Sequence, residues 1–253
     1  MRLFISSLQK LSRVRVFILT GQSNARGSGH NIDANPSELG LQDNVKIWIK
    51  GSGWQTLNIG VNNRPSDLDP DRHGFELGFA QEIKTYYPND EIYLIKYAIG
   101  GTFMSEHLSG GVVYEELWNN YVVPSINNLI SNDKFPYVNM IMSQGENDST
   151  DNALTLDYVN KLNTWVNLWR SNIGSNIGII NYEMKISNGN SASINTDWIN
   201  KASSDPLHTS LDTKNESDVG DNVHYDYLGQ KSIASKGTIA LKQFGGQQIT
   251  DLL

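Results

Sequence analysis

The chain has 253 residues, a net charge of −7 (20 Lys and Arg against 27 Asp and Glu) and no cysteine. This length fits one large domain, whose core needs no disulfide. The composition excludes thiolate metal sites and a cysteine nucleophile, and the acidic balance argues against nucleic acid or an anionic membrane as a partner.

The N-terminal segment is not a convincing signal for export. Its apolar stretch, Leu3–Leu8, is short, is interrupted by two serines and is not followed by a small-residue cleavage site. No apolar run approaches the roughly 20 residues of a membrane span. These features favour a cytoplasmic protein, with a domain of a longer exported or phage-borne chain as the alternative. No oligomeric state is predicted.

Predicted strands and helices alternate along most of the chain. A buried strand over Val14–Thr20 precedes a polar, turn-rich segment over 27–73, in which Val45–Ile49 and Trp54–Ile59 could pair as a small hairpin beside the site. Then come a helix near Phe75–Ile83 that ends before Pro88, a strand over Ile92–Ala98, and a helix over Tyr114–Ile130 that Pro124 must kink or interrupt. A strand over Val138–Ser143, a helix over Leu156–Trp169, a strand over Ile177–Glu183 and a helix over Tyr227–Phe244 complete the series.

The predicted strands are nearly continuous runs of β-branched and apolar residues, which is typical of strands covered on both faces. Strands that alternate with helices favour parallel pairing. The sequence therefore predicts an α/β protein: a three-layer α/β/α sandwich around a mainly parallel sheet. We expect a single domain over residues 1–253, with its core at roughly 14–244.

The first strand ends in Gly21-Gln22-Ser23-Asn24-Ala25. Ligands of such folds bind beyond the carboxyl ends of the strands, where Ser23 would face a cleft. The stretch is not the nucleophile elbow of α/β-hydrolases, because Ala25 stands where that motif needs glycine. The alternative role for Ser23 is a turn residue or a helix cap.

A serine nucleophile needs an oriented histidine that accepts its proton. His224 has Asp221 three residues before it, close enough to fix the tautomer of the ring so that its other nitrogen faces Ser23. This arrangement requires the two ends of the chain to converge. The alternative is an Asp helix cap with an incidental histidine, and Asp218 is a second carboxylate that could take the role.

Two further strand ends carry groups that could stabilise an oxyanion. Gly100-Gly101-Thr102 follows the second buried strand, and Gln144-Gly145-Glu146-Asn147-Asp148 follows the third. Backbone N–H groups at Ser23, Gly100 or Gly101 and the side-chain amides of Gln144 and Asn147 are the candidate donors. The alternatives are an ordinary turn and a polar helix cap.

A divalent-metal site built from Glu146, Asp148, Asp221 and His224 is disfavoured. No histidine-rich spacing supports zinc, and a metal leaves Ser23 unexplained. We therefore predict neither a metal nor another cofactor.

Together these blocks resemble the SGNH (GDSL-like) hydrolase superfamily, and within it the sialate O-acetylesterase and acetylxylan esterase branch, carbohydrate esterase family 6. The matching blocks are Gly-Gln-Ser-Asn at 21–24, Gly-Gly-Thr at 100–102, Gln-Gly-Glu-x-Asp at 144–148 and Asp-x-x-His at 221–224. His73–Ala80 resembles the helix start of that branch, although Phe75 stands where proline is usual. The resemblance spans Val14 to Phe244 and implies the flavodoxin-like SGNH hydrolase fold.

The resemblance implies that Ser23 is the nucleophile, His224 the base and Asp221 its orienting group. It implies oxyanion donors at Ser23, at Gly101 or Gly100, and at Asn147 or Gln144. The superfamily's Gly-x-Asn-Asp pattern favours Asn147, whereas the narrower branch favours Gln144. Gln22 and Glu146, within the same motifs, are assigned to substrate binding.

The predicted function is removal of O-acetyl groups from a carbohydrate, such as acetylxylan, sialic acid or a similar acetylated glycan, through an acetyl-enzyme intermediate. The alternatives are a catalytically silent glycan-binding module on the same fold and a lipase or thioesterase of the same superfamily. Four residues are candidates for stacking on a sugar, but they are equally expected as packing residues and are not assigned: Trp48, Trp54, His73 and Trp198.

Overall fold

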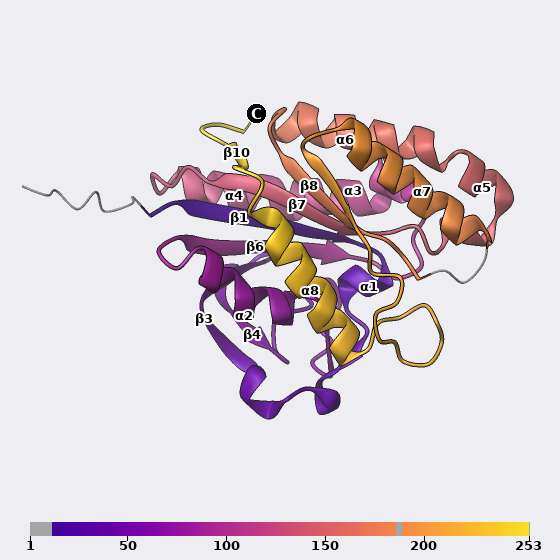
Figure 1. Cartoon of the computed structure of the whole chain (residues 1–253). Coiled ribbons are helices and arrows are strands. Elements are labelled where there is room, and N and C mark those ends of the chain that lie inside the picture. The colour runs from indigo at the N-terminus through magenta and orange to yellow at the C-terminus, as the bar shows by residue number, and fades with distance from the viewer. Residues whose placement is uncertain (1–11, 186–188, 253) are drawn as a thin grey trace, which may run out of the picture.

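The computed structural model describes residues 12–185 and 189–252 and contains an eight-stranded, mainly parallel sheet (Figure 1). The strand order is β4-β3-β6-β1-β7-β8-β9, and β10 pairs with β7 beside this path. The strands are β1 (Val14–Gly21), β3 (Gly40–Ile49), β4 (Gly53–Ile59), β6 (Glu91–Ala98), β7 (Tyr137–Ser143), β8 (Gly178–Tyr182), β9 (His208–Leu211) and β10 (Gln247–Gln248). A separate two-stranded sheet pairs β2 (Gly29–His30) with β5 (Arg72–His73).

Helices cover both faces of the sheet (Figure 1). One face carries α2 (Glu76–Tyr86) and α8 (Tyr227–Leu241). The other carries α3 (Val112–Glu116), the π-helical η4 (Leu117–Val122), α4 (Val123–Ile130), α6 (Tyr158–Ile173) and α7 (Gly189–Ser204), with α5 (Asn152–Leu156) beside them. Short helices lie in the connections: α1 (Ser23–Arg26), η1 (Asn31–Asp33), η2 (Pro36–Glu38), η3 (Met104–His107) and η5 (Asp148–Thr150).

The alternation of side chains along β1 explains the continuous apolar run in its sequence. Val16 and Ile18 are fully buried in the core beneath α6 and α7, whereas Phe17 and Leu19 are fully buried in the core beneath α2 and α8. Because successive side chains of a strand point to opposite faces, a strand with a core on each side is apolar along most of its length.

The predicted buried strands are confirmed as β1, β6, β7 and β8, with boundaries within one residue. The predicted hairpin forms from β3 and β4, and β3 also pairs in parallel with β6, so the hairpin extends the main sheet at its edge. The helix predicted over Tyr114–Ile130 is interrupted as expected: the π-helical η4 separates α3 from α4 just before Pro124. Pro124 then falls in the first turn of α4, where a missing N–H leaves no helical bond unmade.

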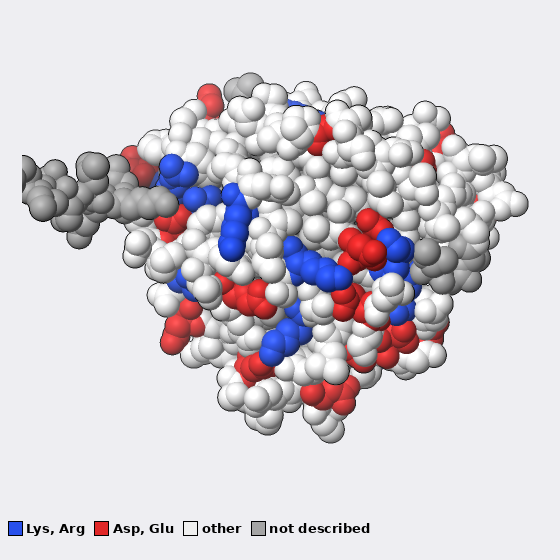
Figure 2. Space-filling view, viewed as in Figure 1, with Lys and Arg blue, Asp and Glu red and all other residues white. Residues whose placement is uncertain are grey.

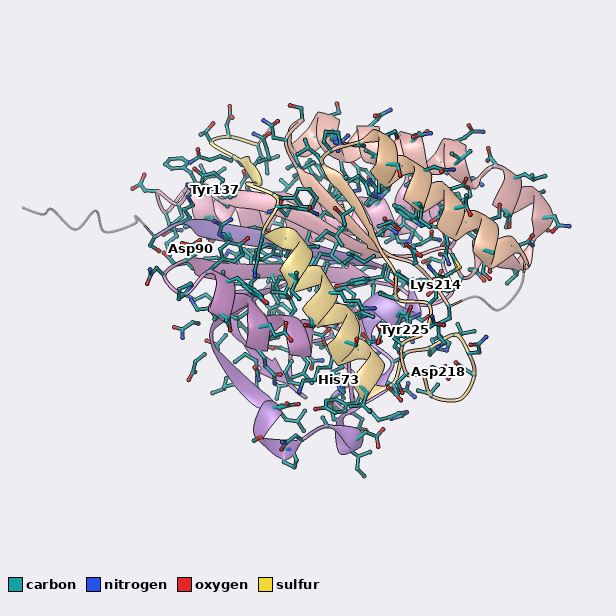
Figure 3. The ribbon with its side chains drawn as sticks, in the orientation of Figure 1. His73, Asp90, Tyr137, Lys214, Asp218 and Tyr225 are labelled. Atoms are coloured by element: carbon teal, nitrogen blue, oxygen red, sulfur yellow. The ribbon has the colours of Figure 1, made fainter. Side chains whose placement is uncertain are left out.

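The aromatic residues considered for sugar stacking pack inside the protein. Trp48, His73 and Trp198 are buried, and His73 lies below α8 in Figure 3. Trp54 is half-buried and packs edge-on against Trp48 and Tyr93. The buried side chains of Trp48, His73 and Trp198 therefore offer no free face for a sugar ring.

The sheet register aligns the three strand ends that carry the motifs. Gly21 at the end of β1 faces Ala98 of β6 on one side and Ser143 of β7 on the other. Gly21 has φ +134°, and a Cβ there would lie 1.9 Å from the carbonyl oxygen of Ser143. Glycine is therefore required where the chain leaves the sheet toward Ser23.

A buried ion pair between Lys96 and Glu76 joins β6 to the start of α2. The ammonium of Lys96, on β6, donates to Glu76 Oε2 at 2.6 Å and to the carbonyl of Arg26, the last residue of α1, at 2.9 Å. Burial disfavours the charge of Glu76, but Lys96 and hydrogen bonds from Gly74 and Asn63 outweigh it and keep the pKa of Glu76 below its ordinary value. Lys96 therefore links the start of α2 and the end of α1 to strand β6.

Removing one partner of this pair should destabilise the fold strongly. Glu76→Gln leaves the Lys96 ammonium buried without its counter-charge, so we expect a loss of about 3–5 kcal/mol in the free energy of unfolding, measured by urea denaturation. The control is Glu91→Gln, which breaks the surface pair of Glu91 with Lys134 (2.5 Å) and should cost less than about 1 kcal/mol. Equal losses in the two variants would contradict this account.

Candidate active site

Ser23 is the first residue of α1, directly beyond the carboxyl end of β1. The backbone N–H of Gln22 donates to the carbonyl of Ser143 at 2.9 Å, which extends the contact between the ends of β1 and β7 by one residue. The Ser23 side chain is mostly buried, with 8% of the residue exposed. Its position is thus set by the sheet rather than by a free loop.

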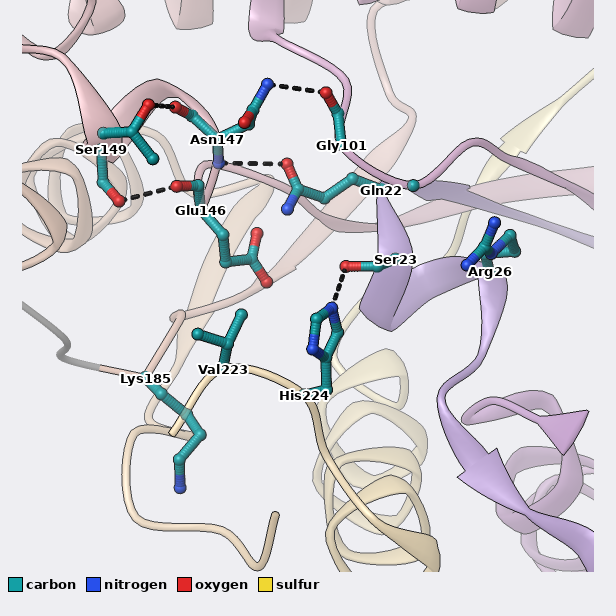
Figure 4. Close-up of a pocket in the computed structure, with 12 residues that line it drawn as sticks. Gln22, Ser23, Arg26, Gly101, Glu146, Asn147, Ser149, Lys185, Val223 and His224 are labelled. Atoms are coloured by element: carbon teal, nitrogen blue, oxygen red, sulfur yellow. Dashed lines mark hydrogen bonds between the residues drawn. The ribbon is translucent and has the colours of Figure 1, made fainter. Parts of the chain in front are cut away.

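The structure brings Ser23, His224 and Asp221 together in one hydrogen-bonded chain. His224 Nε2 lies 2.9 Å from Ser23 Oγ, across a sequence separation of 201 residues (Figure 4). On the other side of the ring, His224 Nδ1 lies 2.6 Å from Asp221 Oδ2. This order of groups allows the imidazole to accept the serine proton while its charge is stabilised by the carboxylate.

Asp218, the competing carboxylate, has other partners. It lies on the loop before α8 (Figure 3), forms an ion pair with Lys185 at 2.8 Å and accepts the N–H of Gly220 at 2.7 Å. Among the described residues, Asp221 is therefore the carboxylate that contacts the His224 ring.

The turn from Asp221 to His224 holds the carboxylate in place. Asp221 Oδ1 accepts the backbone N–H groups of Val223 at 2.9 Å and of His224 at 2.8 Å, and Asn222 between them has φ +56°. Burial raises the pKa of Asp221, but these N–H groups and the His224 ring outweigh it and leave that pKa below its ordinary value. The carboxylate therefore stays ionised at neutral pH.

Asn24 is a site residue that the sequence analysis did not single out. It is fully buried, and its amide donates to the carbonyl of Val223 at 2.9 Å and to Glu146 Oε1 at 2.7 Å. Its oxygen accepts the N–H of Tyr225 at 3.0 Å. Asn24 thus holds the His224 loop against α1. The sequence signal that could have identified Asn24 as a site residue was its place beside Ser23 in the Gly-Gln-Ser-Asn block.

A cavity of about 470 Å³ opens beside Ser23 and His224, and its lining includes Gly100, Gly101 and Asn147. The Asn147 amide donates to the carbonyl of Gly101 at 2.6 Å, which joins the loops after β6 and β7. Gln144 does not line this cavity. It is buried, donates to Asp148 at 2.7 Å and accepts the hydroxyl of Tyr158 at 2.6 Å. The structure therefore brings Asn147, and not Gln144, to the candidate site.

Gln22 and Glu146 also line this cavity, but both have internal partners. Gln22 Oε1 accepts the backbone N–H of Asn147 at 3.4 Å (Figure 4). Glu146 accepts from Asn24, and its second oxygen is shielded from solvent without a hydrogen-bond partner among the described residues. Burial raises the pKa of Glu146. These contacts give the two side chains a part in joining the loops of the site.

A second cavity of about 500 Å³ is also lined by Ser23 and His224, together with Asp221 and three arginines. Ser23 and His224 therefore line both cavities. Within residues 12–185 and 189–252, no group of three or more His, Asp or Glu side chains is placed to hold a metal ion.

Comparisons with known proteins agree with this fold and its motifs. The family model described as carbohydrate esterase, sialic acid-specific acetylesterase, matches residues 13–241. No curated protein matches the chain.

Solved structures match over nearly the whole chain. A protein from Arabidopsis thaliana matches with a TM-score of 0.76 at 19% identity, over 89% of this chain and 98% of that chain. NanS matches with a TM-score of 0.70 at 13% identity, over 92% and 98%. A carbohydrate acetylesterase from Xanthomonas citri matches with a TM-score of 0.60 at 14% identity, over 91% of this chain and 56% of that one. At these identities the structures confirm the predicted SGNH-type α/β fold.

The two carboxylates of the His224 loop should differ sharply in their effect on esterase activity. Asp221→Asn keeps the shape but favours the wrong tautomer of His224, so kcat toward 4-nitrophenyl acetate should fall by about 10³–10⁴-fold. Asp218→Asn, on the same loop, should lose far less, because Asp218 contacts Lys185 and not the ring. A larger loss at Asp218 than at Asp221 would reverse the assignment.

Proposed function

Because the chain belongs to the sialic acid-specific acetylesterase family of carbohydrate esterases, we propose that it removes O-acetyl groups from a sugar with Ser23 as the nucleophile. The observation that carries the mechanism is the hydrogen-bonded chain from Ser23 Oγ through His224 to Asp221, at 2.9 Å and 2.6 Å. In this hydrogen-bonded series the serine hydroxyl contacts its base, and the base contacts the carboxylate that orients it.

In the first half of the reaction, Ser23 Oγ attacks the acetyl carbonyl carbon while His224 Nε2 takes the hydroxyl proton. The carbonyl oxygen becomes an oxyanion. The proposed donors to it are the N–H of Ser23, the N–H of Gly101 or Gly100, and the Asn147 amide. When the bond between the carbonyl carbon and the sugar oxygen breaks, His224 returns the proton to that oxygen and the sugar leaves.

In the second half, a water molecule attacks the acetyl group on Ser23 and gives its proton to His224. The bond between the acetyl carbon and Ser23 Oγ breaks, Oγ regains the proton from His224, and acetate is released. Asp221 stays ionised throughout and stabilises the imidazolium at each stage. The cycle needs only water as co-reactant.

Polar side chains at the first cavity support a sugar as the alcohol of the ester. Gln22, Arg26, Asn147 and Lys185 border that cavity and can hydrogen-bond to sugar hydroxyls. The description of the family and the similarity to a carbohydrate acetylesterase of Xanthomonas citri support an acetylated carbohydrate, with acetylated sialic acid and acetylxylan as the substrates to test.

Figure 2 shows Lys and Arg side chains interspersed with Asp and Glu over one face, without a continuous basic area. In the described part of the chain, none of the helices combines the length and apolar character of a membrane span. A catalytically silent binding module is disfavoured by the hydrogen-bonded set of reacting groups.

Ser23→Ala should abolish acetate release from both acetylated sugars and 4-nitrophenyl acetate. Removing the nucleophile of a serine hydrolase lowers kcat by roughly 10³–10⁶-fold, because only oxyanion stabilisation and binding remain. The matched control, Ser131→Ala, changes an exposed serine that hydrogen-bonds only within its own turn, to Asn128, and should keep activity. Turnover by folded Ser23→Ala close to that of the parent would reject the mechanism.

A further inference from the structure

Glu146 places a carboxyl group next to the reacting groups, and the proposed mechanism does not use it. It lines the first cavity together with Ser23 and His224, and its side chain points toward them (Figure 4). Glu146 Oε1 accepts an N–H of the Asn24 amide at 2.7 Å, whereas Oε2 is shielded from solvent and has no hydrogen-bond partner among the described residues. In the ionised form, Oε2 would carry negative charge that no donor stabilises.

The orientation of the Asn24 amide identifies Glu146 Oε1 as an acceptor. Asn24 Oδ1 accepts the backbone N–H of Tyr225 at 3.0 Å, and Asn24 Nδ2 donates to the backbone carbonyl of Val223 at 2.9 Å. A backbone N–H only donates and a carbonyl only accepts, so the two ends of the amide cannot be exchanged. Because Nδ2 also donates to Oε1, a proton on the Glu146 carboxyl group belongs to Oε2.

Glu76 shows what a buried glutamate of this protein needs in order to stay ionised. Its carboxylate accepts the Lys96 ammonium, the N–H of Gly74 and the amide of Asn63, and its pKa lies below the ordinary value. Glu146 has one neutral amide as its donor. The two carboxyl groups therefore differ in the feature that decides their charge, a buried cation in contact.

The cations nearest to Glu146 have other carboxylate partners. Arg26 and Lys185 line the same cavity as Glu146. Arg26 lies 3.6 Å from Asp67, and Lys185 forms an ion pair with Asp218 at 2.8 Å. Neither side chain is placed to balance a charge on Glu146.

The other titratable groups around Glu146 are an acid, two phenols and the proposed base: Asp148, Tyr158, Tyr225 and His224. Burial is the largest influence on the pKa of Glu146 and raises it, and the charge of Asp148 raises it further. The N–H of Glu146 itself, the Asn24 amide and the His224 ring lower this pKa but do not outweigh burial. These surroundings favour the neutral acid.

A negative charge on Glu146 would also oppose the proposed reaction. The candidate oxyanion donors Gly100, Gly101 and Asn147 line the cavity that Glu146 lines, so the oxyanion would form there. A carboxylate in that cavity would repel the oxyanion, whereas a neutral acid would not.

We propose that Glu146 is a positioning residue that works as a neutral carboxylic acid. Its Oε1 fixes Asn24, and Asn24 fixes the His224 loop through Val223 and Tyr225. The proton on Oε2 keeps negative charge out of the cavity in which the oxyanion forms. This inference rests on the proposed function, which places the oxyanion in that cavity.

Two substitutions of Glu146 separate its hydrogen bond from its charge. Glu146→Leu leaves the Asn24 amide without its acceptor, so kcat toward 4-nitrophenyl acetate should fall by about 10–100-fold as the His224 loop loses its fixed position. Glu146→Gln is uncharged at every pH but keeps an oxygen for Asn24, so it should restore most of the activity that Glu146→Leu loses. The control, Glu91→Gln, removes one negative charge at the opposite end of β6 and should keep the kcat of the parent.

Carbon NMR of the protein with isotope-labelled glutamate carboxyl groups reads the charge directly. The resonance that is absent from Glu146→Gln belongs to Glu146. It should be that of a protonated acid at neutral pH, whereas an ordinary glutamate ionises at about pH 4.3. As the pH rises through the range in which this resonance titrates, kcat of the parent should fall, because the carboxylate then opposes the oxyanion. Glu146→Gln should lack that fall.

A Glu146 resonance that is ionised at neutral pH would overturn the inference. So would a folded Glu146→Gln that loses as much activity as Glu146→Leu, a Glu146→Leu as active as the parent, or the same pH dependence of kcat in Glu146→Gln and the parent. A parent enzyme that releases no acetate from acetylated sugars or from 4-nitrophenyl acetate would instead reject the proposed function.

Discussion

The parallel register of β1, β6 and β7 is the constraint on which the candidate site depends. Gly21 faces Ala98 and Ser143 across the sheet, so the chain leaves three neighbouring strands at the same level. The proposed nucleophile and the proposed oxyanion donors lie within five residues of these strand ends. His224 and Asp221 are the exception, because they lie on a separate loop. A shift of one residue in any of these strands would exchange the side chains that pack on its two faces, so close packing against both cores opposes that shift.

The loop that carries His224 lies outside the main sheet. Hydrogen bonds of buried polar groups hold it in place. Asn24 fastens the loop to α1 through Val223 and Tyr225, and its bond to Glu146 adds the loop after β7. At the end of α1, Lys96 donates to the carbonyl of Arg26. Buried hydrogen-bonded groups tolerate little displacement, so the distance between Ser23 and His224 follows from these contacts.

The sequence was sufficient for the parts of the fold that rest on long apolar runs and for the convergence of Ser23, Asp221 and His224. It was insufficient for α7, whose 16 residues bury only Ser191, Ile194, Asn195 and Trp198, too few apolar positions for a helical stripe. The choice between Gln144 and Asn147 depended on which amide faces the cavity, and spacing does not encode that. The arginines of the second cavity were also beyond prediction, because two of them, Arg64 and Arg72, lie in a segment without periodicity.

Covalent labelling with a fluorophosphonate tests the central claim most directly, since the reagent reacts with a serine only when a base removes its proton. Peptide mapping by mass spectrometry should find the label on Ser23 in the parent protein, and the rate of labelling should collapse in His224→Gln. Labelling of Ser23 that proceeds equally fast without His224, or no labelling of Ser23 in the folded parent, would contradict the account.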